Sequence, residues 1–162
     1  MIGLVDTGGN TLSVMRAFAA IGSPVWRLDN AAVIPECSAL IVPGQGAFGS
    51  LSSAMKAAIA LHIGLDKPYL GICLGLQLLY NGSDEAPGVW GLNFLPGRVR
   101  KLLGRTPRMG YEEVPSVGRM YFAHSYSGGA DIVRLRNVTG VQFHPEKSGS
   151  AGLEFLRGWA NG

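Results

Sequence analysis

Short apolar runs alternate with amphipathic stretches through the first half of the chain. The runs are bounded by glycine, proline or charged residues, and the run at Ala39–Val42 contains no polar residue. A strand that is apolar at every position is typical of a parallel sheet covered on both faces. The pattern predicts strands at Ile2–Val5, Val25–Leu28, Ala39–Val42 and Tyr69–Ile72.

The stretches between these strands have helical spacing. Leu12, Met15 and Phe18 share one face of a predicted helix over residues 12–22, with Asn10 or Thr11 as its N-cap. Further helices are predicted at 50–62 and 74–80. This alternation predicts an α/β fold of three layers, in which helices flank a mostly parallel central sheet.

The second half of the chain is richer in turns, and it is expected to be more antiparallel. A closing helix is predicted at 150–160. Short strands before it are predicted at 97–102, 111–114, 120–123, 131–135 and 138–143. No repeat, low-complexity stretch or linker divides the sequence, so residues 1–162 are expected to form one domain.

Residues 71–75, Gly-Ile-Cys-Leu-Gly, join the predicted strand Tyr69–Ile72 to the next helix. A cysteine between two glycines at a strand-to-helix turn is the nucleophile-elbow pattern, with sulfur in place of a serine oxygen. The glycines let neighbouring backbone pass close, and the helix N-terminus favours a thiolate at Cys73. Burial as a structural residue is the commoner fate of cysteine, but this order of elements is uncommon and favours a nucleophile.

Residues 44–49, Gly-Gln-Gly-Ala-Phe-Gly, match the dinucleotide-binding spacing G-x-G-x-x-G after a strand. That motif also requires an acidic residue at the end of the next strand, whereas Asp66 precedes its strand. Dinucleotide binding is therefore not expected. A glycine-rich loop of this kind can instead present backbone N–H groups to a reacting carbonyl.

Composition and charge narrow the class of protein. Two cysteines, Cys37 and Cys73, make no disulfide framework and favour a reduced, cytoplasmic location, and neither a signal peptide nor a membrane-spanning run is recognised. The net charge of +3 is concentrated after residue 97, chiefly between Arg98 and Arg108. This segment lacks aromatic residues for base stacking, so no nucleic-acid partner is expected, and a solvated ribbon or an acidic partner is favoured.

A cysteine nucleophile needs a base, and the chain offers three histidines. His62 ends a predicted helix and is expected at the surface or as a cap, while His124 ends a predicted strand. His144 follows the last predicted strand and opens the tripeptide His-Pro-Glu. The proline keeps this piece extended, which places His144 and Glu146 on the same side and lets the carboxylate support the base.

Residues 71–77 and 140–146 together resemble the two active-site motifs of the class I (triad) glutamine amidotransferases. Further segments are similar to one branch of that family, the glutaminase subunits of imidazole glycerol phosphate synthase. These segments are 43–49 (Pro-Gly-Gln-Gly-Ala-Phe-Gly), 88–92 (Gly-Val-Trp-Gly-Leu), 95–99 (Leu-Pro-Gly-Arg-Val), 109–111 (Met-Gly-Tyr), 124–126 (His-Ser-Tyr) and 146–149 (Glu-Lys-Ser-Gly). The resemblance extends from the first predicted strand to the last helix.

The resemblance implies a role for each matching residue. Cys73 would be the nucleophile, His144 the general acid and base, and Glu146 the residue that orients it. The oxyanion hole would be formed by Gly44, Gln45, Gly46 and Leu74. The positions that bind the substrate match Gln77, Glu85, Ser125 and Tyr126. The positions that face the partner subunit match Asn10, Tyr121 and Lys147.

The implied reaction is hydrolysis of L-glutamine to glutamate and ammonia through a Cys73 thioester, with no metal and no organic cofactor. The implied partner is a (β/α)8-barrel cyclase that forms a heterodimer with the chain and uses the ammonia in histidine biosynthesis. The chain is shorter than is usual in this branch, above all between Tyr126 and Val141, and Tyr111 stands where tryptophan is usual.

Two alternatives remain open at this point. One is the glutaminase subunit of another synthase, of the pyridoxal phosphate or anthranilate type. The other is a catalytically idle subunit that only binds and regulates a barrel partner. The intact Cys73, His144 and Glu146 argue against an idle subunit, and residues 109–111 and 146–149 favour the histidine branch.

Overall fold

The computed structural model describes residues 1–162 and is built around a six-stranded sheet with the order β10-β11-β4-β3-β1-β2. Five neighbouring strands are parallel, and only the edge strand β10 (Ile132–Leu135) is antiparallel to its neighbour. The parallel strands are β1 (Ile2–Val5), β2 (Val25–Leu28), β3 (Ala39–Val42), β4 (Tyr69–Ile72) and β11 (Val138–Val141). The first four have the bounds that the apolar runs predict.

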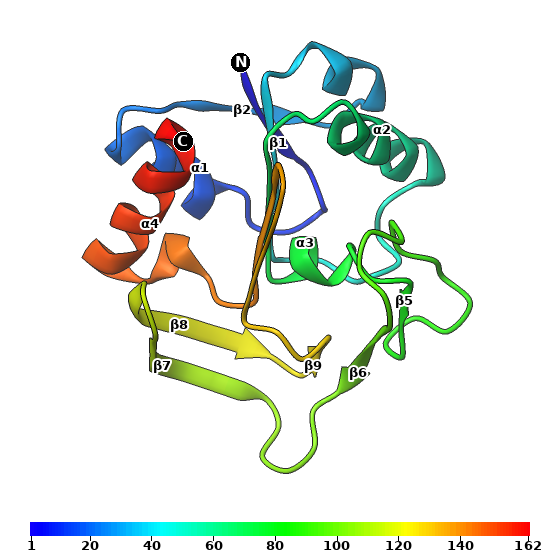
Figure 1. Ribbon diagram of the computed structural model, residues 1–162, viewed down its shortest axis with the longest axis vertical. Helices are drawn as coiled ribbons and strands as arrows, with labels where there is room; N and C mark the ends of the chain where they lie inside the picture. The colour runs from blue at the N-terminus through cyan, green and yellow to red at the C-terminus, as the bar shows by residue number, and fades with distance from the viewer.

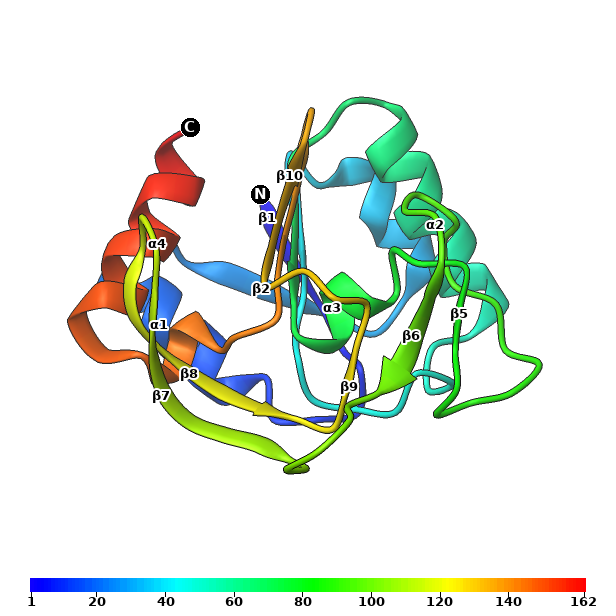
Figure 2. The same cartoon turned by 60° about the horizontal axis from the view of Figure 1, so that its bottom comes forward.

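Helices cover both faces of this sheet, as Figures 1 and 2 show. Helices α1 (Leu12–Ala20) and α4 (Gly149–Asn161) lie on one face. The opposite face carries α2 (Ser53–Gly64), the one-turn helix α3 (Leu74–Gln77) and the 3₁₀ helix η1 (Ala31–Glu36). The three-layer α/β fold is therefore confirmed. None of the helices combines the length and apolar character that a bilayer crossing requires.

The core consists of two buried clusters, one on each face of the sheet. In β3, Leu40 packs into the cluster under α2, whereas the next residue, Ile41, packs into the cluster under α1 and α4. Tyr69 and Leu70 of β4 divide in the same way. Successive side chains of a strand point to opposite faces, so a strand covered on both sides needs apolar residues at every position.

A second group of strands lies beyond the carboxyl end of the sheet. The hairpin of β7 (Arg108–Val114) and β8 (Gly118–His124) crosses this end, in the yellow-green part of Figure 1. The short strands β5 (Gly82–Ser83), β6 (Arg98–Lys101) and β9 (Tyr126–Ser127) form a small sheet beside it. The hairpin and the β6–β9 and β10–β11 pairs are antiparallel, which confirms the predicted character of the second half.

Two local predictions are wrong. The helix predicted at 74–80 ends at Gln77, because the chain then tightens: the Leu79 N–H donates to the Leu76 carbonyl at 3.1 Å, an i→i+3 bond. His62 is not a surface residue, since it is 1% exposed and its Nε2 lies 3.1 Å from the Pro68 carbonyl oxygen. The end of α2 that carries His62 packs onto the loop that precedes β4, and the local sequence does not reveal this contact.

Candidate active site

The carboxyl ends of β4 and β11 bring the candidate catalytic residues together. These strands are parallel neighbours in which Ile72 pairs with Val141. The Cys73 N–H continues the ladder by donating to the Val141 carbonyl at 2.7 Å. Residues just beyond the ends of adjacent parallel strands share one crevice, the usual place for a site in an α/β sheet.

Cys73 lies at a strained turn, as the elbow motif predicts. Its φ of 48° and ψ of −96° are sparsely populated for a residue with a side chain. The flanking glycines are required because the backbone folds back on itself: a Cβ on Gly71 would lie 2.5 Å from the Gly75 carbonyl carbon, and one on Gly75 would collide with the Val42 carbonyl oxygen. The turn therefore holds Cys73 at the carboxyl end of the sheet.

His144 and Glu146 form a buried pair. His144 Nδ1 lies 2.8 Å from Glu146 Oε1, and the two side chains are 3% and 4% exposed. The sequence anticipates this contact, but its geometric reason is wrong. Only His144 is extended, and residues Pro145–Lys147 turn into the 3₁₀ helix η2, with proline at a position that a helix start tolerates.

The charge state of His144 follows from this pairing. Burial lowers its pKa, but hydrogen bonds with Cys73 and Glu146 and the charges of both partners outweigh burial and raise the pKa to about 9. Because Nδ1 is bonded to Glu146, Nε2 is the ring nitrogen left for Cys73. The base that a cysteine nucleophile requires is therefore next to Cys73.

The glycine-rich loop after β3 packs directly over the Cys73–His144 pair. A Cβ on Gly44 would lie 2.7 Å from His144 Cε1 and 2.8 Å from Cys73 Cβ. The Gln45 carbonyl accepts a hydrogen bond from the Thr7 hydroxyl, and the Gln45 side chain accepts one from the Asn10 N–H at 3.1 Å. The loop through Gly44, Gln45 and Gly46 is thus held by the segment after β1.

Leu74 is the first residue of α3, directly after Cys73. The N–H groups in the first turn of a helix have no partner within the helix. The residues expected to form an oxyanion hole therefore come together around Cys73, from α3 on one side and from the loop after β3 on the other.

The residues expected to bind glutamine come from three places. Gln77 is buried, and its Nε2 donates to the Tyr126 carbonyl at 2.8 Å, so these two meet. Glu85 is exposed and accepts a hydrogen bond from the Phe48 N–H at 3.4 Å, which places it against the glycine-rich loop. Ser125 links β8 and β9, and its carbonyl accepts from the Leu102 N–H.

Two of the three expected partner-facing residues are neighbours. The Lys147 Nζ lies 6.0 Å from the centroid of the Tyr121 ring, and the Tyr121 carbonyl accepts a hydrogen bond from the His144 N–H at 2.8 Å. Tyr111 packs edge-to-face against Tyr121 at 5.2 Å and its hydroxyl donates to the Lys147 carbonyl. Asn10 lies apart from this group, against Gln45.

The sequence interpretation assigns no role to Gln142. It is fully buried, and its Nε2 donates to Cys73 Sγ at 3.4 Å. One feature of the sequence could have pointed to this role. Gln142 is a polar residue within the predicted strand 138–143, and it directly follows Val141, which pairs with Ile72.

The basic run of residues 98–108 is partly neutralised within the chain. Arg98 pairs with Asp84, and Arg108 pairs with both Glu112 and Asp131. The predicted ribbon is therefore not uniformly free for an acidic partner. No cluster of three or more histidine, cysteine or acidic side chains suited to a metal ion is found.

A cysteine elbow on this fold, beside a buried histidine–carboxylate pair, defines the class of enzymes that use a thiol as nucleophile. Residues 4–127 match the family model "Glutamine amidotransferase class-I", and the chain belongs to this family of enzymes.

Curated relatives narrow the similarity within that family. The chain is 39% identical to "Imidazole glycerol phosphate synthase subunit HisH" of Thermus thermophilus, over 94% of this chain and 93% of the relative. Subunits of the same name from Exiguobacterium sibiricum and Methanothermobacter thermautotrophicus are each 37% identical, over 98% and 97% of this chain and 94% and 96% of the relatives. The Thermus alignment spans 184 positions against the 162 residues here, so the relative has residues that this chain lacks.

Solved structures agree on the fold. "Crystal structure of glutamine amidotransferase" superposes with a TM-score of 0.78 at 19% identity, covering 99% of both chains. "Structure of PurLQS from Thermotoga maritima" gives a TM-score of 0.70 at 17% identity, over 99% of this chain and 97% of that one. At such identities the superpositions establish the fold alone.

Proposed function

We propose that residues 1–162 form one catalytic domain, the glutaminase subunit of imidazole glycerol phosphate synthase, which hydrolyses L-glutamine to glutamate and ammonia. The observation that carries this proposal is the similarity to HisH subunits over nearly the whole chain. The Cys73, His144 and Glu146 arrangement supplies the chemistry. A cytoplasmic location fits two cysteines that are both free.

In the first step, the Cys73 thiolate attacks the side-chain carboxamide carbon of glutamine and forms a carbon–sulfur bond. Backbone N–H groups of Leu74 and of the loop at Gly44–Gly46 would stabilise the tetrahedral oxyanion. His144, protonated at neutral pH, gives its proton to the departing nitrogen. The carbon–nitrogen bond breaks, ammonia leaves, and a thioester remains on Cys73.

In the second step, neutral His144 takes a proton from a water molecule, which attacks the thioester carbon. The carbon–sulfur bond then breaks, glutamate leaves after its new carboxyl group loses a proton to solvent, and the thiolate–imidazolium pair is restored. Glu146 holds the imidazole in one orientation through both steps, because its carboxylate occupies Nδ1. Gln77, Glu85, Ser125 and Tyr126 are proposed to hold the substrate.

The partner is proposed to be a (β/α)8-barrel cyclase that receives the ammonia and docks over Tyr121, Lys147 and Asn10. The Tyr121 carbonyl is bonded to the His144 N–H, and Asn10 is bonded to Gln45. A partner contacting these residues would therefore press on both the acid–base residue and the glycine-rich loop. Lys147→Ala is expected to weaken binding of the cyclase, measured by calorimetry, while Lys101→Ala on β6 leaves it unchanged.

The test of the proposed function is ammonia release from glutamine, measured with and without the cyclase subunit. Wild type is expected to turn over in the complex and Cys73→Ser to lose turnover, whereas Cys37→Ala, which removes the other thiol, retains it. Full turnover by Cys73→Ser would exclude the thioester mechanism. Labelling of Cys73 by a glutamine-mimicking electrophile without turnover would instead indicate an idle subunit.

A further inference from the structure

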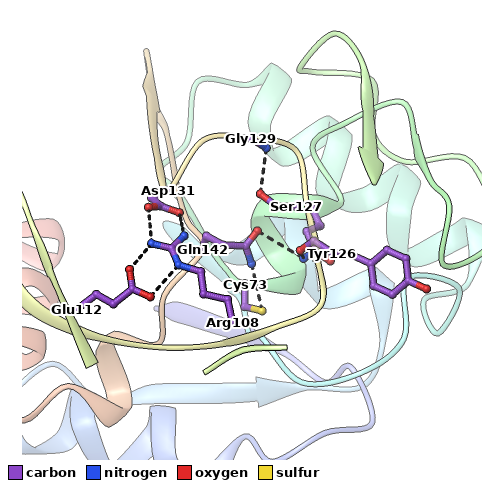
Figure 3. Close-up of polar contacts among 9 residues, drawn as sticks. Cys73, Arg108, Glu112, Tyr126, Ser127, Gly129, Asp131 and Gln142 are labelled. Carbon is purple, nitrogen blue, oxygen red and sulfur yellow. Dashed lines mark hydrogen bonds and ion pairs between the residues drawn. The ribbon is translucent and has the colours of Figure 1, made fainter. Parts of the chain in front are cut away.

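Three buried or half-buried polar groups form a line that ends at the Cys73 sulfur. Gln77 Nε2 donates to the Tyr126 carbonyl at 2.8 Å and lies 3.5 Å from Gln142 Oε1. Gln142 Nε2 then donates to Cys73 Sγ at 3.4 Å. Figure 3 shows the Gln142 amide between the cysteine and the strand that carries Tyr126.

The direction of these hydrogen bonds is fixed by the first of them. A backbone carbonyl only accepts, so the Gln77 group facing Tyr126 is the amide NH₂. The same NH₂ also faces Gln142, so the facing atom of Gln142 must be its oxygen. The Gln142 NH₂ is therefore the end that points at the sulfur.

The backbone of Gln142 is anchored as well. Its N–H donates to the Asp131 carbonyl at 2.9 Å, and the Asp131 carboxylate is held by Arg108 at 2.6 and 3.0 Å. The Arg108 guanidinium also stacks on the Phe122 ring, 3.8 Å from its centroid. The short segment between Tyr126 and Asp131 thus contacts the glutamine pair at both ends, and Arg108 fixes it to the hairpin (Figure 3).

We propose that Gln142 is a positioning residue for the nucleophile: its NH₂ holds the Cys73 sulfur as a thiolate facing the substrate, with Gln77 and the Arg108–Asp131 pair keeping the amide in place. The inference rests on the proposed glutaminase function. A donor hydrogen-bonded to a charged acceptor is stronger than one bonded to a neutral group, so this contact favours the thiolate.

Other charged groups near the sulfur do not duplicate this contact. His144, which directly precedes η2, is the titratable hydrogen-bond partner of Cys73. His124 on β8 has no hydrogen bond from either ring nitrogen, and Asp131 is paired with Arg108, which also pairs with Glu112. Gln142 differs from His144 in that its donor is present at every pH.

The experiment is alkylation of Cys73 by iodoacetamide in a Cys37→Ala background, followed by mass spectrometry from pH 5 to 10. Gln142→Met replaces the amide by an apolar side chain of similar length and so removes the donor. We expect alkylation about tenfold slower at pH 7, with the pH profile moved to higher pH, and kcat lowered more than KM is raised. A folded Gln142→Met variant with wild-type rate and profile would overturn the proposal.

Gln142→Glu keeps the shape and the acceptor for Gln77 but places a carboxylate beside the sulfur. It is expected to slow alkylation at pH 7 at least as much, and it decides the question if Gln142→Met does not fold. Alkylation as fast as wild type in Gln142→Glu would equally overturn the proposal.

The anchor is tested by a matched pair of variants. Asp131→Asn weakens the Arg108 contact that holds the segment and is expected to slow alkylation two- to fivefold. Glu112→Gln makes the same change at the other partner of Arg108 and is expected to leave the rate unchanged. Equal alkylation rates in Asp131→Asn and Glu112→Gln would show that the contact between Arg108 and Asp131 does not help to hold Gln142 in place. Alkylation is measured without glutamine, so it tests the role of Gln142 independently of the proposed function. Failure of the proposed function would instead be seen as a wild-type protein that releases no ammonia from glutamine.

Discussion

Nδ1 of His144 lies 2.8 Å from Oε1 of Glu146, and this contact is almost completely enclosed by protein. The second carboxylate oxygen, Oε2, is also buried and has no hydrogen-bond partner. A buried carboxylate with one partner is costly unless that partner carries the opposite charge. The pair therefore holds His144 both in orientation and in its protonated form.

Glu146→Gln tests the orienting role. The amide keeps the size of the side chain but loses the charge that stabilises the imidazolium, so kcat is expected to fall on the order of 100-fold. The measurement is ammonia release from glutamine in the complex with the cyclase. His144→Asn, which removes the acid–base group itself, sets the lower limit, and wild-type turnover in Glu146→Gln would contradict the role.

The raised pKa of His144 is directly measurable. Hydrogen bonds and charges from Cys73 and Glu146 overcome burial and raise the pKa to about 9, so the ring is expected to stay protonated at pH 7.5. The measurement is an NMR titration of the histidine rings. Removing either partner, by Cys73→Ala or Glu146→Gln, is expected to lower the midpoint. A midpoint at or below 6.5 in the wild type would contradict the charge assignment.

His124 makes the fold sensitive to acid. Burial, followed by the charge of Arg108, lowers its pKa to about 4 from an ordinary 6.5. Between pH 4 and pH 6.5 the unfolded chain binds this proton more tightly than the folded chain does. The free energy of unfolding is therefore highest above pH 6.5, and it falls by on the order of 2–3 kcal/mol as the pH drops toward 4. Urea unfolding from pH 4 to 7.5 is the measurement.

The matched variants for this effect are His124→Gln and His62→Gln. Burial also lowers the pKa of His62, so both histidines contribute with the same sign. His124→Gln is expected to flatten the pH dependence more than His62→Gln, because no hydrogen bond compensates either ring nitrogen of His124. An unchanged slope in His124→Gln would assign the acid sensitivity to other groups.

Much of the central sheet follows from local sequence. Strands buried on both faces need continuous apolar runs, and such runs bound β1, β3 and β4, whereas the edge strand β2 buries only its end residues, Val25 and Leu28. Cys73, His144 and Glu146 were also within reach, because an elbow and a His-x-Glu tripeptide are short motifs. Their mutual contacts depend on β4 and β11 being neighbours, which the strand order of the fold supplies.

What the sequence could not reveal depends on long-range packing. Gln142 reaches the sulfur because β11 pairs with β4 in one register, and a shift of one residue would turn its side chain to the other face. The pairing of Arg108 with Asp131 joins the hairpin to a loop far along the chain. Burial of His62 and the early end of α3 likewise arise from neighbouring segments and not from helical propensity.

Gly44→Ala tests how closely the glycine-rich loop is fitted to the site. The added methyl group would lie 2.7 Å from His144 Cε1 and 2.8 Å from Cys73 Cβ, so either the loop or the catalytic pair must move. Small displacements of reacting groups are costly, and kcat/KM for glutamine is expected to fall at least about 100-fold. Gly158→Ala in α4 is the matched control: its Cβ meets nothing within 4 Å, so activity should be unchanged and the free energy of unfolding should rise by about 0.5–1 kcal/mol. Wild-type kcat/KM in Gly44→Ala would show that the loop stands clear of the nucleophile during turnover.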